Sequence, residues 1–479
     1  MKYKKFIFLW FTYLLFFTRC IPIHPVVTET GQFKYVKEIN RVIRDSGLKA
    51  NMGIKVVSLQ SGKTLYELNS ERLFTPASNN KLYTGLGALM LLGKDFTFET
   101  SVYLNGSTLI LKGGGDPDLT LEQLDSLANT VASYVEGVDV LLLDDTLLDS
   151  VPFGTGWMWD EGPWWYAAQI SALTVNDNVV DFIIAPGTIA KPVEVTLSPQ
   201  TDYILVQNNS MTVQDTTGLQ ELKIERDWFH ETNNFLISGN LLVTSPVDTF
   251  YRNIEDPTLF AGTVFREMLE AHKVRVGIIK KGSLPDNSKL LTSHKSAPLL
   301  EAVTNLLKKS DNLSAELLIK VIGHESSGTQ GTWQNGLQAI KTFLYNEIEI
   351  DTAGLYLADG SGVSRYNLTT PTQLVKLLTF AFSREDFRES FLTSLPIGGW
   401  DGTLKKRMKN SSAGNRIHAK TGTLEGVSCL SGYAFTKNNE PLAFSIMMNG
   451  YVGSASPYRK LQDDICRILV DKSHLYSFP

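Results

Sequence analysis

The chain has 479 residues, of which 43% are hydrophobic and 20% charged, and its formal net charge is −5 at pH 7. This is the composition of a soluble globular protein, and the length is too great for one ordinary core, so two or three domains are expected. The weak negative charge and the lack of a basic stripe give no reason to expect a nucleic-acid partner.

Residues 1–20 have the pattern of an export signal. Three lysines, at positions 2, 4 and 5, precede an apolar run from Phe6 to Phe17, which is shorter than the roughly 20 residues that cross a bilayer. No clear cleavage site follows. Cys20 leaves lipid attachment open, although Arg19 suits a lipoprotein signal poorly. We therefore predict an exported, periplasmic protein, and leave open whether its N-terminus stays attached to the membrane.

The segment after the signal is predicted to contain two helices and two strands. Apolar residues at helical spacing indicate a helix over 31–48. Strands are expected at 53–59 and 64–67, joined by a tight turn. A second helix is expected to begin near Pro76, because proline suits the first helical position.

The central part of the chain, from about residue 94 to 292, has the pattern of β-rich modules. Its short apolar stretches are separated by frequent turn residues, which is typical of small sheets. Two helices are expected within it, near 120–136 and 257–272. Strands are expected at 96–104, 108–112, 138–143, 179–184, 193–197, 222–225 and 235–243.

After Pro298 the pattern is helical again, and the chain then ends in strands. Leucine-rich faces predict helices over 299–307 and 313–322. Three further strands are followed by a helix that begins at Ser456, where a serine cap precedes a proline. The three strands are expected at 417–421, 427–435 and 442–448.

Two strands near the start of the chain and three near its end could close one antiparallel sheet with helices on both faces. This predicts an α+β fold in which a discontinuous domain, 28–93 and 293–479, is interrupted by a β-rich insertion, 94–292.

Three short motifs occur in order along the chain. They are Ser-Asn-Asn-Lys at 78–81, Ser-Asp-Asn at 310–312 and Lys-Thr-Gly at 420–422. Each alone is common, as a helix surface pair, a turn or a hairpin start. Together, in a predicted helix, an inter-helix loop and a strand, they match the trio of active-site serine β-lactamases and penicillin-binding proteins.

The chemistry of the trio is coherent. A hydroxyl such as that of Ser78 is a weak nucleophile and needs a base, and Lys81 can act as that base if burial and the second cation, Lys420, lower its pKa. We expect Lys81 to be neutral and Lys420 charged in the resting enzyme. Ser310 can relay a proton to the leaving amine, and Asn312 can bind a substrate carbonyl or hold a lysine.

The strand that carries Lys-Thr-Gly is expected to bind the peptide substrate along its exposed edge. Gly422 permits close approach of another backbone, and Thr421 and Thr423 flank it. The backbone N–H groups of Ser78 and Thr423 are predicted to form the oxyanion hole.

On these motifs the sequence resembles the class C low-molecular-mass penicillin-binding proteins, the D-alanyl-D-alanine carboxypeptidase/endopeptidases of peptidase family S13. The resemblance implies a transpeptidase-like domain, interrupted between the first and second motifs by two smaller domains. It also implies an acyl-enzyme reaction on peptidoglycan stem peptides and covalent inhibition by β-lactam antibiotics. No cofactor is predicted, and no metal either, because His324-Glu325 lacks the second histidine of a zinc motif. Further stretches that resemble the family are 113–117, 171–178, 359–365 and 399–404.

The resemblance also suggests a pocket for the stem peptide. The stretch Trp157-Met-Trp-Asp160 is similar to the family's inserted acidic segment, and Arg365 ends the Asp-Gly-Ser-Gly loop. We predict that Asp160 binds a side-chain amine such as that of diaminopimelate, that Arg365 binds its carboxylate, that Trp157 packs on the stem and that Leu424 lines the floor. The alternative is that the tryptophans belong to the core of the insertion and Arg365 to a surface ion pair.

Two other functions stay open at this point. The chain could be a catalytically idle wall-binding protein of the same fold, or a β-lactamase or esterase. Labelling by fluorescent penicillin, followed by the release rate, distinguishes them. The balance of carboxypeptidase and endopeptidase action, the oligomeric state and the pairing of Cys429 with Cys466 are not predicted.

Overall fold

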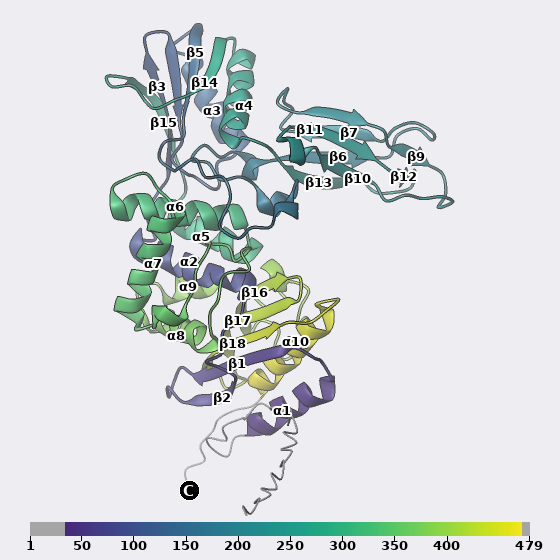
Figure 1. The fold of residues 1–479 in the computed structure, drawn as a ribbon, viewed down its shortest axis with the longest axis vertical. Coiled ribbons are helices and arrows are strands. Elements are labelled where there is room, and N and C mark those ends of the chain that lie inside the picture. Colours follow the sequence, from purple (N-terminus) through teal and green to yellow (C-terminus); the bar gives the residue numbers. More distant parts are fainter. Residues whose placement is uncertain (1–33, 472–479) are drawn as a thin grey trace, which may run out of the picture.

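The computed structural model describes residues 34–471. Within them, the two ends of the chain build one five-stranded antiparallel sheet with the order β16-β17-β18-β1-β2 (Figure 1). Strand β1 pairs with β18 over its whole length, and Ile54 lies opposite Ile446. The predicted α+β class with such a sheet is therefore confirmed. The strands are β1 (Asn51–Ser58), β2 (Thr64–Leu68), β16 (Ile417–Leu424), β17 (Val427–Phe435) and β18 (Pro441–Asn449).

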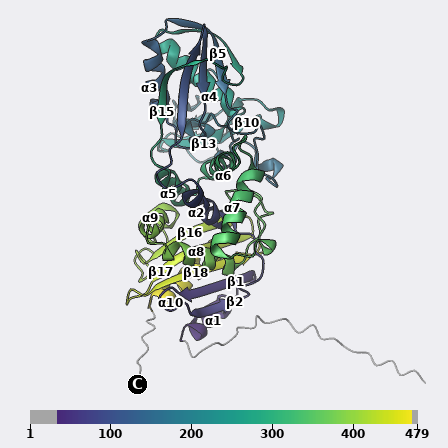
Figure 2. The ribbon, with the colours of Figure 1, turned by 90° about the vertical axis from the view of Figure 1, so that its left-hand side faces the viewer.

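The side chains of this sheet alternate between two hydrophobic cores. On β17, Cys429 and Tyr433 face a core shared with a large helical layer. Leu430 and Ala434 face a core shared with α1 (Lys34–Ser46) and α10 (Ser456–Asp471). A period of two is what a strand buried on both faces requires. The half of the molecule built from the two chain ends is thus a sheet between two layers of helices (Figure 1 and Figure 2).

The larger helical layer has well-formed helix starts. At the start of α6 the side chain of Asp311 accepts from the N–H groups of Leu313 and Ser314. At the start of α8, Thr370 and Gln373 form a capping box. A cap of this kind stabilises a helix by about 1 kcal/mol. The helices are α2 (Lys81–Leu91), α5 (Leu299–Lys309), α6 (Asn312–Ser327), α7 (Trp333–Ile348), α8 (Pro371–Ser383) and α9 (Arg388–Ser394).

A second five-stranded sheet is inserted between α2 and α5. Its order is β14-β5-β4-β3-β15, in which β4, β5 and β14 are parallel. Parallel neighbours need crossover connections, and these contain α3 and α4, which pack on each other. The last strand ends at Lys295, beyond the expected boundary at 292. The elements are β3 (Glu99–Asn105), β4 (Thr108–Lys112), α3 (Leu121–Ala132), β5 (Gly137–Asp144), α4 (Pro257–Ala271), β14 (Arg275–Lys281) and β15 (Lys289–Lys295).

The other strands form three small sheets in an arm that projects sideways from the inserted part (Figure 1). Their orders are β13-β6-β7, β10-β11-β8 and β12-β9. The single strand expected over 235–243 is broken at Gly239, because its φ of 89° leaves the extended region. The strands are β6 (Val179–Ala185), β7 (Glu194–Ser198), β8 (Leu205–Asn208), β9 (Met211–Val213), β10 (Lys223–Arg226), β11 (Asn234–Ser238), β12 (Asn240–Leu242) and β13 (Asp248–Asn253).

Lys320 on α6 joins the helical layer to the segment that follows β5 of the inserted sheet. Its buried ammonium donates to Asp149 Oδ1 at 2.5 Å and to the carbonyl of Val151 at 2.7 Å. It also lies 3.8 Å from the centroid of the Trp333 ring. A buried charge needs such partners. The contacts anchor the segment that then continues towards the catalytic motifs.

The described chain begins with α1 and ends with α10, and both helices pack on the same face of the first sheet. No helix among residues 34–471 is long and apolar enough to cross a membrane. Cys429 and Cys466 are both buried free thiols. The predicted export signal, residues 1–20, lies outside the described residues.

Candidate active site

Ser78 lies on a short 3-10 turn, η1 (Ala77–Asn80), directly before α2. The α-helix that was expected to begin near Pro76 begins instead at Lys81. The reason is local, because Ala77 has a φ of 48°, in the left-handed region that a helix does not use. Ser78 therefore sits on a turn, and Lys81 begins the helix behind it.

The ammonium nitrogen of Lys81 makes three hydrogen bonds. It lies 3.2 Å from Ser78 Oγ, 2.6 Å from Asn312 Oδ1 and 2.8 Å from the carbonyl oxygen of Ser361. The last two atoms can only accept, so they occupy two N–H groups. A neutral amine has two N–H groups and one lone pair, and the lone pair is then left for the hydroxyl of Ser78. The geometry fits a general base for this serine.

Burial also favours this role for Lys81. Desolvation lowers the pKa of Lys81 to about 8, while the carboxylates of Glu316, Asp311 and Asp359 oppose the change. With a pKa of about 8, about one tenth of the side chain is neutral at pH 7, against roughly three in ten thousand for an ordinary lysine. The site therefore supplies a usable base near neutral pH.

Lys420 makes a separate set of contacts. Its Nζ lies 2.8 Å from Ser310 Oγ and 2.9 Å from the carbonyl oxygen of Thr421. Burial and the nearby charge of Lys81 lower the pKa of Lys420 well below its usual range. The carboxylates of Glu316, Asp311 and Asp359 favour the charged form of Lys81 and so act against the predicted neutral Lys81 beside a charged Lys420. These buried acids could not be placed from sequence.

Strand β16 offers a free edge beside Ser78. The N–H of Ala419 and the carbonyl of Ile417 both bond to segment 396–398. Since alternate residues of a strand point to the same edge, the N–H groups of Thr421 and Thr423 point to that edge too. The Thr423 N–H can therefore face a peptide bound along this edge, as the predicted oxyanion hole requires.

Gly422 allows β16 to approach the serine turn closely. A Cβ atom at this position would lie 2.6 Å from the carbonyl oxygen of Pro76 and 3.2 Å from the backbone nitrogen of Ser78. The side chain of Asn79 fastens the turn to the strand, because its Nδ2 donates to the carbonyl of Lys420 at 2.7 Å. The first and third motifs are thus held together by backbone contacts that a larger residue would disrupt.

A buried glutamate that the sequence analysis did not single out holds a loop beside Lys81. Oε2 of Glu316 accepts from the N–H of Gly360 at 2.8 Å and from Trp333 Nε1 at 2.6 Å, and Oε1 accepts from the N–H of Ser361 at 2.8 Å. Burial raises the pKa of Glu316 to about 7. Because the carbonyl of Ser361 binds Lys81, Glu316 positions one partner of the base.

A second buried acid, Asp359, organises the same loop. Its Oδ1 accepts from the N–H of Gly362 at 2.8 Å and from Asn367 Nδ2 at 2.7 Å. Its Oδ2 accepts from the N–H of Ser364 at 2.6 Å and from Trp157 Nε1 at 3.0 Å. The last bond joins the loop to the inserted region.

The predicted stem-peptide residues lie around this loop but are not all in contact. Arg365 is exposed and donates from Nη1 to the carbonyl of Glu425 at 3.0 Å, next to the half-buried Leu424. Asp160 is exposed in the short turn η2 (Trp159–Glu161). Among the described residues, no hydrogen bond or ion pair joins Asp160 to Arg365.

The inserted region also reaches the second motif. The side-chain Nδ2 of Asn312 donates to the carbonyl of Tyr166 at 2.8 Å. Tyr166 follows η2 closely, so the segment that carries Trp157 and Asp160 runs past the catalytic groups. Its position is consistent with a substrate-binding role.

Both missed acids carried signals in the sequence. Glu316 follows Asn312 by four residues, so the two side chains share one face of α6. Asp359 begins the Asp-Gly-Ser-Gly stretch, in which small residues allow a tightly bonded loop. A buried acid one turn after a catalytic asparagine could have been proposed on this ground.

Comparison with known proteins gives a consistent result. The model of the D-Ala-D-Ala carboxypeptidase 3 (S13) family matches residues 35–470. A D-alanyl-D-alanine carboxypeptidase from Actinomadura sp. (strain R39) is 36% identical over 447 residues, 88% of this chain and 81% of that protein. The D-alanyl-D-alanine carboxypeptidase DacB from Haemophilus influenzae is 26% identical over 423 residues, 84% and 86% of the two chains.

Solved structures show the same fold. The crystal structure of penicillin binding protein 4 (dacB) from Haemophilus influenzae superposes with a TM-score of 0.79. It is 23% identical, and the match covers 91% of this chain and 99% of that one. The same protein complexed with a β-lactam superposes with a TM-score of 0.74.

Proposed function

The chain belongs to the D-Ala-D-Ala carboxypeptidase 3 (S13) family, and from this premise we propose that Ser78 is the nucleophile of a serine-type D-alanyl-D-alanine carboxypeptidase. Its substrates are peptidoglycan stem peptides, and β-lactam antibiotics are its covalent inhibitors. The observation that carries the assignment of Ser78 is the hydrogen-bond set of Lys81, which leaves a lone pair for this hydroxyl alone.

In the proposed acylation step, Ser78 Oγ attacks the carbonyl carbon of the penultimate D-alanine while Lys81 takes the hydroxyl proton. The N–H groups of Ser78 and Thr423 stabilise the oxyanion that forms. The C–N bond then breaks, the leaving amine takes a proton through Ser310, and D-alanine departs. Water hydrolyses the ester in the second half-reaction and restores Ser78.

Lys420 would then help to set the charge of Lys81. A D-alanyl-D-alanine end carries a free carboxylate, and the free edge of β16 places Thr421 and Thr423 next to Lys420. A bound carboxylate favours the charged form of Lys420, which in turn repels a proton on Lys81. Substrate binding would thereby favour the neutral, basic form of Lys81.

We also propose that the stem peptide binds between Trp157, Asp160, Arg365 and Leu424. Trp157 is bonded to Asp359, Leu424 is the last residue of β16, and Arg365 donates to the carbonyl of Glu425, which follows it. Asp160 is exposed and free to bind a side-chain amine, and Arg365 can release the carbonyl of Glu425 to bind a carboxylate. Tyr166 adds a hydroxyl to the same segment, and burial together with the neighbouring carboxylates of Glu161 and Asp160 raises the pKa of that hydroxyl.

We further propose the domain division 28–93 and 293–479 for the catalytic domain, with 94–292 as the insertion. The two five-stranded sheets support it, and so do two cores, one that lies wholly in the catalytic domain and one that lies wholly in the insertion. Strand β15 carries the inserted sheet on to Lys295, slightly beyond the second boundary. The enzyme is extracytoplasmic, where its substrate is. We propose more specifically that it is periplasmic and is exported through residues 1–20.

The experiment that tests the proposed function uses a diaminopimelate-containing pentapeptide. We expect release of terminal D-alanine, loss of that release after treatment with penicillin, and a fluorescent penicillin adduct that is released slowly. Rapid turnover of penicillin without D-alanine release would indicate a β-lactamase. The absence of both labelling and D-alanine release would indicate a catalytically idle wall-binding protein.

A further inference from the structure

A pocket lies in the inserted region beside Trp157. Its volume is about 320 Å³. The walls come from two separate segments, one that follows Phe153 and one that joins β10 to β11. Trp157 lines this pocket and also donates to the loop beside the catalytic lysine, so the pocket adjoins the proposed stem-peptide site.

Exposed aromatic rings form one side of the pocket. Trp159 is 75% exposed and Phe229 is 73% exposed, and Trp228 stands between them. The ring centroids of Trp159 and Trp228 are 5.5 Å apart, with the planes tilted by 38°. Large apolar faces left in water mark binding surfaces. The faces of such rings carry negative potential and attract the weakly positive C–H groups of a sugar ring.

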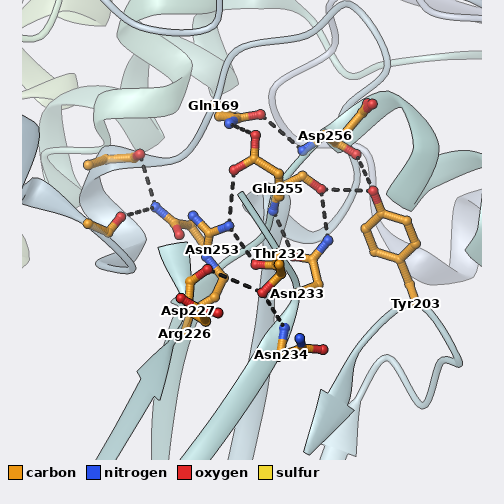
Figure 3. Close-up of polar contacts among 12 residues, drawn as sticks. Gln169, Tyr203, Arg226, Asp227, Thr232, Asn233, Asn234, Asn253, Glu255 and Asp256 are labelled. Carbon is orange, nitrogen blue, oxygen red and sulfur yellow. Dashed lines mark hydrogen bonds and ion pairs between the residues drawn. The ribbon is translucent and has the colours of Figure 1, made fainter. Parts of the chain in front are cut away.

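The floor of the pocket is polar and buried. Arg226 is 5% exposed, and its Nη1 donates to Glu255 Oε2 and to the carbonyl of Thr232, both at 3.1 Å. Gln169 donates to the other oxygen of Glu255 at 2.5 Å (Figure 3). Arg226 Nε, however, has no hydrogen-bond partner among the described residues. A buried N–H without an acceptor is costly, so a shift of the floor side chains that opened this donor to a ligand oxygen would relieve that cost.

The charge of the pocket selects against an anionic ligand. Three acids line it, Glu161, Glu231 and Glu255, against the single base Arg226. The free carboxylates of a stem peptide would be repelled here. A neutral sugar is not repelled, its hydroxyl groups can donate to the carboxylates, and an acetamido oxygen can accept from Arg226 Nε.

We propose that this pocket binds an N-acetylhexosamine unit of the glycan strand to which the stem peptide is attached. The proposal rests on the proposed function, because a peptidoglycan substrate carries neutral N-acetylated sugars next to the peptide that the catalytic site holds. It makes the enzyme selective for glycan-linked peptides over free ones.

The test compares two substrates with the same pentapeptide, one free and one linked to its disaccharide. We expect the wild-type protein to cleave the linked substrate with about tenfold higher kcat/KM. Trp159→Ala should remove most of that preference and leave the free pentapeptide unchanged. Trp164→Ala is the matched control, because Trp164 is 43% exposed on the same segment but does not line the pocket.

Binding is measured separately, on penicillin-acylated protein, by tryptophan fluorescence with N,N′-diacetylchitobiose as the probe. Cellobiose, which lacks the acetamido groups, should bind about tenfold more weakly. Equal kcat/KM on both substrates would overturn the proposal, and so would an equal loss on both in Trp159→Ala. Cleavage of the free pentapeptide would still support the proposed function. Displacement of the probe by a sugar-free peptide would also overturn it, and would assign the pocket to peptide.

Discussion

Replacing Glu316 with glutamine should impair the proposed base Lys81 indirectly, through the loop that Glu316 holds. The carboxylate accepts three N–H groups, from Gly360, Trp333 and Ser361. A glutamine keeps one accepting oxygen. In its better orientation it retains Gly360 and Trp333 and turns its own NH₂ group towards the N–H of Ser361, so a charged hydrogen bond is lost and two donors face each other.

The magnitude follows from the lost bond. A hydrogen bond to a charged group contributes about 1.5–3 kcal/mol, and about 2 kcal/mol expressed in the transition state is roughly a 30-fold lower rate. The carbonyl of Ser361 would no longer hold Lys81 in place. We expect the second-order acylation rate with fluorescent penicillin to fall about 10- to 30-fold at its alkaline plateau.

The pH profile separates positioning from a general loss of stability. Acylation requires neutral Lys81, so in the wild-type protein the rate should rise with pH and level off above the pKa of about 8. The charge of Glu316 raises the pKa of Lys81, so removing it should move the midpoint to lower pH. Glu325→Gln, an exposed change on the same helix, should leave rate and midpoint unaltered. A Glu316→Gln protein with the wild-type plateau and midpoint would refute the reasoning.

Three further changes test other parts of the site. Lys81→Arg should abolish acylation near neutral pH, because guanidinium does not give up its proton, and near-normal labelling would overturn the role of Lys81. Gly422→Ala should lower the acylation rate about tenfold or more, because the new Cβ meets backbone atoms within 3.2 Å. Gly354→Ala should not, because its new Cβ would lie 3.8 Å from Gln373 Nε2, an ordinary van der Waals contact. Asp160→Ala should lower kcat/KM on diaminopimelate peptide about tenfold and leave penicillin acylation unchanged, and equal losses on both would contradict the pocket.

Much of the architecture could be predicted because local signals and the motif order agreed. The five strands of the first sheet each carry an apolar pattern, and the motif order required both chain ends to meet. The start of α2 was misplaced because nothing in the sequence shows that Ala77 adopts a positive φ. The break at Gly239 needed the same kind of backbone information.

The motifs propose the residues of the site, but they do not show its electrostatics. The trio gives Ser78, Lys81 and Lys420, but the charge on each amine depends on which buried acids lie near it. Glu316 and Asp359 come from different segments, and their approach to Lys81 is a product of tertiary packing. The sequence alone could not show which acids lie near the two amines.

The central claim is that Ser78 forms the acyl-enzyme. It is tested most directly by mass spectrometry of the protein after reaction with benzylpenicillin and protease digestion. The account predicts one penicilloyl group per chain, on the peptide that contains Ser78, and none in a Ser78→Ala protein that stays folded. A penicilloyl group on Ser310 or on any other residue, or a labelled Ser78→Ala protein, would contradict it.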